Sequence, residues 1–278
     1  MTFINPKTDF AFKKIFGSKK SKEILISFLN AILYQEQEMI QDLEILDPYQ
    51  SPRIQGIKDS YLDVKAVITG NKTVIIEMQV LNVLGFEKRV LYNAAKAFSI
   101  QLGVGEDYNL LNPVIALTIT DFEMFANSAK VISRYCLKEK ETLTDYTDDI
   151  ELVFVELPKF NKTLEESETL TDKWLYFLKF ANTLKDVPPP MATIPAMKQA
   201  FTIAKQSKLT KRELEVLEKR EIFIQDSQNA IRKAKLEGKE EGMNEKANAI
   251  ARELLDVLDI ETISQKTGLS ITEIQDLT

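Results

Sequence analysis

Two short runs rich in β-branched residues, separated by a tight-turn sequence, constrain the fold of this 278-residue chain more than any other feature. The runs are residues 61–68 (YLDVKAVI) and 73–80 (TVIIEMQV), with TGNK between them at 69–72. Runs of this composition around a glycine-containing turn are typical of a β-hairpin. A further run at 113–119 (PVIALTI) is almost wholly apolar, which predicts a strand buried on both faces of a sheet.

The other segments before residue 160 alternate between helical and strand patterns. Helices are expected at 9–17, 21–33 and 86–102, and further strands from Leu43 up to Pro48, at 131–137 and at 150–157. Asp9 is the expected N-cap of the first helix and Gly17 its stop. This alternation predicts an α/β domain over residues 1–160.

Beyond residue 160 the pattern is helical. Helices are expected at 171–184, 191–206 and about 210–255, and the prolines at 188–190 form a hinge between the first two. The longest is charged and weakened by Gly238 and Gly242, so it is either one exposed helix or a pair. The last residues, 259–277, predict a compact helical hairpin that turns at TGLS. We therefore expect a helical extension over residues 161–278.

The composition excludes several classes of enzyme and metal site. The chain has no histidine and one cysteine, Cys136, which excludes Ser-His-Asp and Cys-His catalysis, histidine metal sites, cysteine metal clusters and an intramolecular disulfide. Single-cysteine usage fits a reducing compartment. The sequence has no signal-peptide pattern at MTFINPKTDF and no apolar run of membrane-spanning length, so we expect a cytoplasmic protein without a membrane partner.

The charge is unevenly distributed along the chain. The net charge of −6 alone argues against a polyanionic partner, but residues 1–130 carry only −1 of it and residues 131–278 carry −5. The first 22 residues hold six lysines and one acid. This local positive segment is either a solvated helix face or a surface that binds a polyanion.

Two carboxylates in the expected hairpin form a candidate site. Side chains two residues apart on a strand share a face, so Glu77 and Gln79 point one way, as do Asp63 and Lys65 on the partner strand. Two carboxylates aimed together repel each other unless a cation lies between them, and oxygen ligands suit Mg²⁺ or Mn²⁺. Such an ion can polarise a phosphate and lower the pKa of bound water. The alternative is that both acids belong to the solvated face of the hairpin.

The length of the hairpin loop decides whether these pairs meet. An odd-numbered loop centred on Gly70 sets Asp63 opposite Glu77, whereas one centred on Asn71 sets Lys65 there. A regular two- or four-residue loop places the pairs on opposite faces, so the site hypothesis requires an odd loop or a bulge.

The hairpin motif lies within a longer pattern that resembles a known family. Asp63 followed by Glu77-x-Gln79 resembles the D…(D/E)-x-K core of the PD-(D/E)XK nuclease superfamily. The surrounding sequence is similar to its Rpn branch, the recombination-promoting nucleases and transposase-like proteins. The segments that carry the resemblance cover nearly the whole chain: DFAFKKIFG, FLNAIL, IEMQV, FEKRVLYNAAKAF, DYNLLNPVIALTITDF, ELPKF and the TGLS unit.

The resemblance implies a fold, an activity and a set of site residues. It implies a restriction-endonuclease-like mixed sheet flanked by helices, and a DNA endonuclease that hydrolyses phosphodiester bonds with Mg²⁺ or Mn²⁺ in recombination or transposition. Carried over by position, Asp63 and Glu77 ligate the metal, and Gln79 stands where most of the superfamily has lysine. Glutamine supplies no positive charge, although its amide can orient a water or a phosphate. Lys65 is a candidate for the missing charge.

Further candidates lie on two expected helices. Arg89, Tyr92 and Lys96 form one polar stripe after the hairpin, which either faces the scissile phosphate or makes ordinary ion pairs. In the N-terminal segment, Lys13 and Lys14 are candidate DNA-binding residues. Asp9 is either a third acidic metal ligand or only the cap of its own helix.

Two further functional hypotheses come from other classes of protein. Glutamine in place of lysine is compatible with a catalytically silent member of the fold that binds DNA or a protein through its helical tail. The terminal hairpin carries one lysine against three acids over 261–277, so direct reading of a DNA groove is not expected there. Regulation or self-association is its expected role, and residues 205–278 are a candidate arm for a homo-oligomer, although no clean heptad run supports a long coiled coil.

Overall fold

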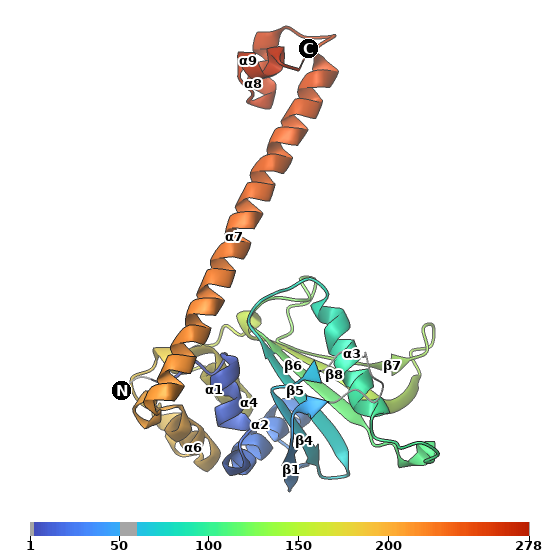
Figure 1. The fold of residues 1–278 in the computed structure, drawn as a ribbon, viewed down its shortest axis with the longest axis vertical. Coiled ribbons are helices and arrows are strands. Elements are labelled where there is room, and N and C mark those ends of the chain that lie inside the picture. Colours follow the sequence, from blue (N-terminus) through green and yellow to red (C-terminus); the bar gives the residue numbers. More distant parts are fainter. Residues whose placement is uncertain (1–2, 51–59, 278) are drawn as a thin grey trace. The chain divides into compact units, whose positions relative to one another are not determined.

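The fold was analysed in a computed structural model that describes residues 3–50 and 60–277. The chain divides into two compact units, Met1–Ile222 and Phe223–Thr278. The first unit contains the mixed sheet and the helices that cover it (Figure 1). The second is wholly helical.

The main sheet has six strands and combines parallel and antiparallel pairing. Its order is β1 (Leu43–Leu46), β4 (Val64–Ile68), β5 (Lys72–Gln79), β6 (Val114–Thr120), β8 (Asp145–Glu156) and β7 (Ile132–Lys138). The central strands β5, β6 and β8 run parallel, and the outer pairs are antiparallel. A separate short pair joins β2 (Tyr49–Gln50) to β3 (Ser60–Tyr61). The expected α/β class with a mixed sheet flanked by helices is therefore confirmed.

The loop of the β4–β5 hairpin has the odd length that the site hypothesis requires. Ile68 pairs with Lys72, so three residues form the loop, with Gly70 at its centre. Gly70 and Asn71 have φ values of 81° and 57°, in the left-handed region that glycine and asparagine tolerate best. The last strand pair joins Val64 to Ile76, and the Asp63 amide also donates to the Ile76 carbonyl at 3.2 Å, which holds Asp63 beside the end of β5.

One face of the sheet is covered by helices from both ends of the first unit (Figure 1). They are α1 (Asp9–Phe16), α2 (Lys22–Tyr34), α4 (Leu170–Phe180) and α6 (Pro195–Ala204). Phe16 and Phe28 from the first two helices contact Trp174 of α4, with ring centroids 5.8 and 5.7 Å from the indole. Because helices from beyond residue 160 share this core, the expected boundary at 160 falls inside the first compact unit, which ends at Ile222.

The other face of the sheet is covered by α3 (Phe86–Ser99). Ala94 and Ala97 of this helix pack against Ile75 of β5 and Ala116 of β6. All seven residues of β6 are buried, as its nearly continuous apolar sequence predicts. The strand bearing Glu77 and Gln79 thus lies between α1 and α2 on one side and α3 on the other.

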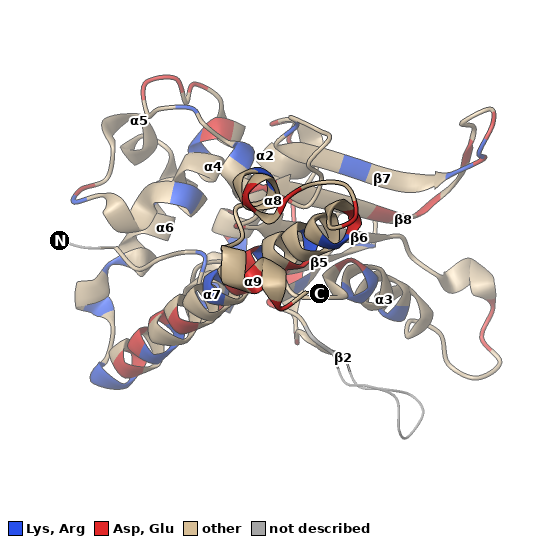
Figure 2. Cartoon of the chain, turned by 90° about the horizontal axis from the view of Figure 1, so that it is seen from above, with Lys and Arg blue, Asp and Glu red and all other residues tan. Residues whose placement is uncertain are grey.

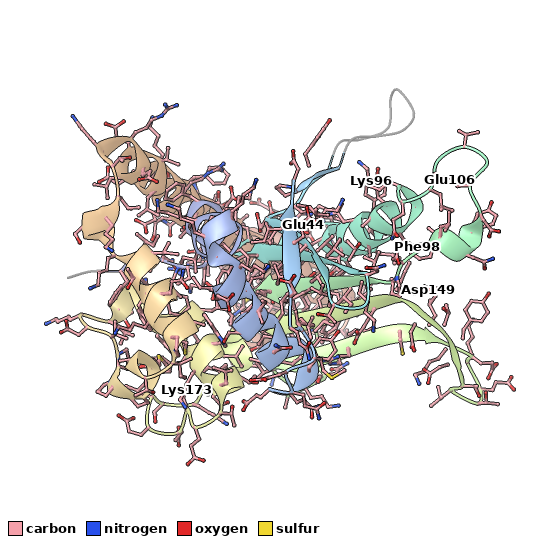
Figure 3. All side chains as sticks on the ribbon, turned by 90° about the horizontal axis from the view of Figure 1, so that it is seen from below. Glu44, Lys96, Phe98, Glu106, Asp149 and Lys173 are labelled. Carbon is pink, nitrogen blue, oxygen red and sulfur yellow. The ribbon has the colours of Figure 1, made fainter. Side chains whose placement is uncertain are left out.

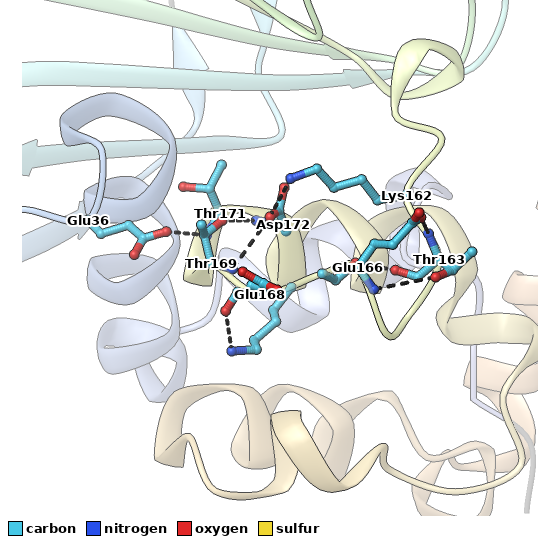
Figure 4. Close-up of polar contacts among 10 residues, drawn as sticks. Glu36, Lys162, Thr163, Glu166, Glu168, Thr169, Thr171 and Asp172 are labelled. Carbon is cyan, nitrogen blue, oxygen red and sulfur yellow. Dashed lines mark hydrogen bonds and ion pairs between the residues drawn. The ribbon is translucent and has the colours of Figure 1, made fainter.

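Polar contacts fix the start of α4 (Figure 4). Thr169 and Asp172 form a capping box, and Lys162 pairs with Asp172 at 2.7 Å. Glu36, which follows α2, accepts a hydrogen bond from the Thr171 amide at 3.0 Å. These contacts tie the loop after the sheet to α2, and so hold α4 in the common core.

The remaining elements of the first unit are short. The prolines expected to form a hinge instead include the first residues of α5 (Pro189–Ala192), where the missing proline N–H costs nothing. Short 3₁₀ turns lie at Lys19–Ser21, Tyr108–Leu110, Leu157–Lys159, Ala181–Thr183 and Gln206–Lys208.

The long helix α7 (Lys211–Leu254) continues through Gly238 and Gly242, so the single-helix alternative is the one observed. Basic and acidic residues are intermixed along it (Figure 2). In the second unit its last turns form a small core with α8 (Ile260–Thr267) and α9 (Ile271–Gln275), the expected helical hairpin. Within the described ranges, no helix combines the length and hydrophobicity needed to cross a membrane.

Candidate active site

The carboxyl of Asp63 lies at the start of β4, beside the end of β5. Its Oδ2 accepts a hydrogen bond from the Met78 amide at 2.7 Å, and its side chain is 11% exposed. Burial, followed by the neighbouring carboxyl of Asp9, raises the pKa of Asp63 to about 7, against the lowering effects of the Met78 amide and Lys13. Asp63 is therefore a buried acid with an acidic neighbour.

Asp9 is not the cap of its own helix. Thr8 is the N-cap, and its hydroxyl accepts a hydrogen bond from the Ala11 amide at 3.3 Å. The capping expectation for Asp9 was wrong because the preceding threonine satisfies that amide. The Asp9 carboxyl is instead bridged to that of Asp63 by the ammonium of Lys13.

The two carboxyls titrate as a pair. Burial raises the pKa of Asp9, but the hydrogen bond from Asp63 and the hydrogen bond and charge of Lys13 lower it overall. One pKa is thus lowered and the other raised, which is the behaviour of two acids that share a proton. In the metal-free protein Asp63 is the partner that keeps the proton.

Lys13 joins the acidic pair from α1. Its ammonium lies 2.6 Å from Asp9 Oδ1, one helical turn away, and 3.4 Å from Asp63 Oδ1. Burial lowers the pKa of Lys13, but the hydrogen bond with Asp9 and the charges of both acids raise it overall. Lys14, its neighbour in sequence, points to α7 and pairs there with Glu213.

Glu77 and Gln79 are brought together by Arg89 of α3. Arg89 Nη2 donates to Glu77 Oε1 at 2.7 Å and to Gln79 Oε1 at 2.9 Å, so the two motif side chains do share a face. The Gln79 amide nitrogen donates to the Leu81 carbonyl at 2.8 Å. Burial raises the pKa of Glu77, although Arg89 and Asn93 partly offset it. The acid is held at its place by cationic and amide donors from α3.

Three other predicted residues lie farther along the same elements. Lys65 pairs in register with Ile75, and Asp47 is the charged group that acts on it, while burial lowers its pKa. Lys96 lies on α3 (Figure 3), and its ammonium is 5.9 Å from the centre of the Tyr92 ring. Of the predicted α3 stripe, Arg89 contacts the hairpin motif, at Glu77 and Gln79.

Two residues at the site escaped the sequence analysis. Asn93 approaches Glu77 Oε2 at 3.5 Å, and Arg220 of α7 lies 3.7 Å from Asp9 Oδ2. Glu213, Leu217 and Arg220 follow at helical spacing and all face the first unit, with Leu217 buried in its core. The sequence does contain this helical spacing, but the spacing does not show which residues these side chains contact.

The oxygen-rich donor set suits a hard divalent cation. Two contacting carboxyls, one with a pKa near 7, are the arrangement that a cation would relieve, and carboxylate oxygens are the ligands that Mg²⁺ and Mn²⁺ favour. The described residues include no group of three or more acidic, histidine or cysteine side chains gathered for one ion, and Glu77 is held by Arg89. Asp9 and Asp63 therefore fit a metal better than Glu77 does in this conformation.

A comparison of the sequence with models of known families shows to which family the chain belongs. Residues 6–234, which include both the hairpin motif and the first turns of α7, match the model of the PD-(D/E)XK nuclease family transposases. The chain belongs to this family. No match was found among curated proteins or among solved structures. A function of the nuclease or transposase type follows at the level of the family, and the resemblance recognised in the sequence is confirmed.

Proposed function

We propose that this PD-(D/E)XK protein is a metal-dependent DNA endonuclease that hydrolyses phosphodiester bonds, with a role in recombination or transposition. The observation that carries the proposal is that Asp9 and Asp63 lie on the same ammonium, that of Lys13, at 2.6 and 3.4 Å, beside the end of β5 that bears Glu77 and Gln79. Acids packed this closely are costly to stability, and such strain is common at catalytic sites.

The side chains divide into binding and positioning roles. Asp63, Glu77 and Asp9 would hold Mg²⁺ or Mn²⁺, and the bound ion supplies a polarised phosphate and a water of lowered pKa. Arg89 fixes the direction of Glu77 and of the Gln79 amide, which orients the attacking water. Release of Glu77 from Arg89 is needed before this acid can serve as a ligand.

DNA is the proposed substrate despite the acidic total charge of the chain. Lys13 and Arg89 lie on the two helices that flank the end of β5, whereas Lys96 is buried about two turns farther along α3. Phosphate contacts by such cations release counterions, so binding should be modest and should weaken steeply with salt. Tyr92 is the aromatic neighbour of Lys96. Lys14 is paired with Glu213, so it is left out of the proposed substrate contacts.

A plasmid assay tests this proposal. Supercoiled DNA is incubated with wild type, Asp63→Asn and Glu77→Gln, in Mg²⁺, in Mn²⁺ and in chelator. The matched controls are Asp42→Asn, an exposed acid paired with Lys22, and Glu44→Gln, an exposed acid on β1. We expect both site variants to lose at least about 100-fold in rate and the controls to match wild type. Equal cutting by all variants would show that these acids are not catalytic.

A catalytically silent binding protein is the second candidate. It is favoured by the fact that Arg89 engages both Glu77 and Gln79, so neither motif side chain is directed at an ion in this conformation. Calorimetric titration with Mg²⁺ separates the two proposals, since an active site should bind the ion and lose it in Asp63→Asn. A silent member should give no heat attributable to these residues.

Self-association through the C-terminal helices is a proposal about partners. On α7, Leu236, Met243 and Ile250 recur every seven residues and are all exposed. The double variant Leu236→Glu with Met243→Glu, in the full chain, should lower the mass measured by light scattering. An unchanged mass would show that this stripe does not assemble the protein.

A further inference from the structure

We propose that Lys13 is the catalytic cation of this site, the side chain that stabilises negative charge on the phosphate. The inference rests on the proposed nuclease function and adds the residue that supplies the positive charge. Neither the hairpin motif nor the strand residue Lys65 provides that charge at the acidic pair.

The side chain of Gln79 cannot fill this role. It is neutral, and both ends of its amide are engaged, the oxygen by Arg89 and the nitrogen by the Leu81 carbonyl. Lys65 is also displaced from the acids, because it stands opposite Ile75 and next to the charge of Asp47. The missing charge must therefore come from outside the hairpin.

The ammonium of Lys13 is the cation that contacts both members of the acidic pair. It lies 2.6 Å from Asp9 and 3.4 Å from Asp63, whereas Arg220 is 3.7 Å from Asp9. A phosphate that reaches these two acids is within reach of the same ammonium. The Lys13 side chain is 40% exposed, so substrate can approach it.

The helix that carries Lys13 is rigidly placed. Thr8 caps α1, and Phe12 and Phe16 are fully buried on the core side, so the helix cannot rotate without opening the core. The next residue, Lys14, leaves the helix about 100° farther round its axis and is paired with Glu213 of α7. Lys14 carries the same charge as Lys13 but points away from the acidic pair, so Lys14→Gln is the matched control for Lys13→Gln.

The chemical step assigns Lys13 an electrostatic role. A water oxygen forms a bond to phosphorus while the bond from phosphorus to the leaving sugar oxygen breaks. The bonding pair departs with that oxygen, which takes up a proton, and the attacking water gives up a proton to the solvent. The non-bridging oxygens gain negative charge in the transition state, and Lys13 keeps its own proton and donates a hydrogen bond to one of them.

Single-turnover cleavage of a labelled duplex tests this role, using wild type, Lys13→Gln, Lys13→Arg and the control Lys14→Gln. We expect Lys13→Gln to be slowed about 100-fold, Lys13→Arg to recover most of that loss, and Lys14→Gln to stay within about twofold of wild type. In calorimetry with Mg²⁺ alone, Lys13→Gln should bind the ion at least as tightly as wild type, because a competing cation has been removed. Methylammonium should partly restore Lys13→Ala.

The outcomes distinguish this inference from the function on which it rests. If wild type cuts and Lys13→Gln cuts equally fast, or Lys14→Gln is slowed as much, Lys13 is not the catalytic cation. If Lys13→Gln loses Mg²⁺ binding together with cleavage, the lysine only holds the acids in place and the proposal is wrong. If wild type binds Mg²⁺ but cuts no DNA, the nuclease proposal itself fails and this one with it.

Discussion

Replacement of Asp63 by asparagine should make the metal-free protein more stable above neutral pH. The folded chain holds the Asp63 proton up to a pKa of about 7, whereas the unfolded chain releases it near 3.8. Between these values the folded state binds more protons, so its stability falls as pH rises. The stabilisation by the Asp63 proton is complete below the pKa of Asp63 in the unfolded chain. It is lost as the pH rises through the pKa of Asp63 in the folded chain.

The magnitude follows from the two pKa values. Full ionisation of Asp63 in the folded state costs about 4 kcal/mol relative to the unfolded chain, at about 1.4 kcal/mol for each tenfold change in proton affinity. At pH 6 protonation still stabilises the fold by about 1 kcal/mol, and at pH 8 by almost nothing. Asparagine is neutral throughout and can still accept the hydrogen bond of the Met78 amide.

Urea unfolding in chelator, followed by the fluorescence of Trp174, measures this effect. Trp174 is the only tryptophan and is fully buried in the core of the first unit, so it reports on that unit alone. Measurements at pH 6, 7 and 8 stay above the pI of about 5.1, near which solubility falls. We expect Asp63→Asn to gain about 1 kcal/mol on wild type between pH 6 and pH 8.

The control variant is Asp42→Asn. Asp42 is an exposed acid whose hydrogen bond with Lys22 lowers its pKa, so Asp42 is ionised at all three pH values in the folded and the unfolded chain. Its difference from wild type should not change with pH. A constant difference between Asp63→Asn and wild type from pH 6 to 8 would refute the raised pKa and the acidic pair inferred from it. At pH 8, Mg²⁺ should stabilise wild type and leave Asp63→Asn unchanged.

Four further substitutions test other parts of the structure. Arg89→Ala leaves the buried acid Glu77 without its cation and should cost about 2 kcal/mol at pH 8. The loss should shrink as the pH is lowered, because burial raises the pKa of Glu77; urea unfolding measures this. Gly238→Ala and Gly242→Ala should each stabilise α7 by about 1 kcal/mol, read from hydrogen exchange, because a Cβ at either place meets no atom within 4 Å. Phe177→Ala should destabilise the sheet unit by about 3–5 kcal/mol in the same unfolding assay, because α4 shares its core.

Each of these expectations has an opposing result. If the stability lost in Arg89→Ala does not shrink as the pH is lowered, Arg89 does not act by stabilising the ionised form of Glu77. If the amide hydrogens of α7 exchange no more slowly in either glycine variant than in wild type, alanine does not stabilise this helix. A Phe177→Ala protein with an unchanged midpoint would mean that the helices after residue 160 do not stabilise the sheet.

Local patterns were sufficient for the secondary structure. The β-branched runs around Gly70, the apolar strand β6 and the helical spacing of Phe12 and Phe16 all led to the elements observed. These preferences are decided by residues close in sequence, through side-chain periodicity and turn conformations that glycine and asparagine adopt easily. The register of β4 on β5 could be expected only as one of several, because the loop length was open.

The composition of the site depended on contacts between distant segments. Sequence alone could not show that Thr8 rather than Asp9 caps α1, that Lys13 and not Lys14 meets Asp63, or that Arg220 reaches Asp9. Each of these depends on how α1 and α7 are rotated and packed, which their own spacing does not specify.

The sequence by itself determined the elements, the mixed α/β class and the family, since these are carried by local periodicity and by an ordered series of motifs. Only the tertiary structure decided the extent of the first unit, which runs to Ile222 because α4 and α6 bury aromatic side chains against α1 and α2. It also decided which charges share the site. The physical reason is the same in both cases: burial and charge pairing act between side chains that are close in space, whatever their separation along the chain.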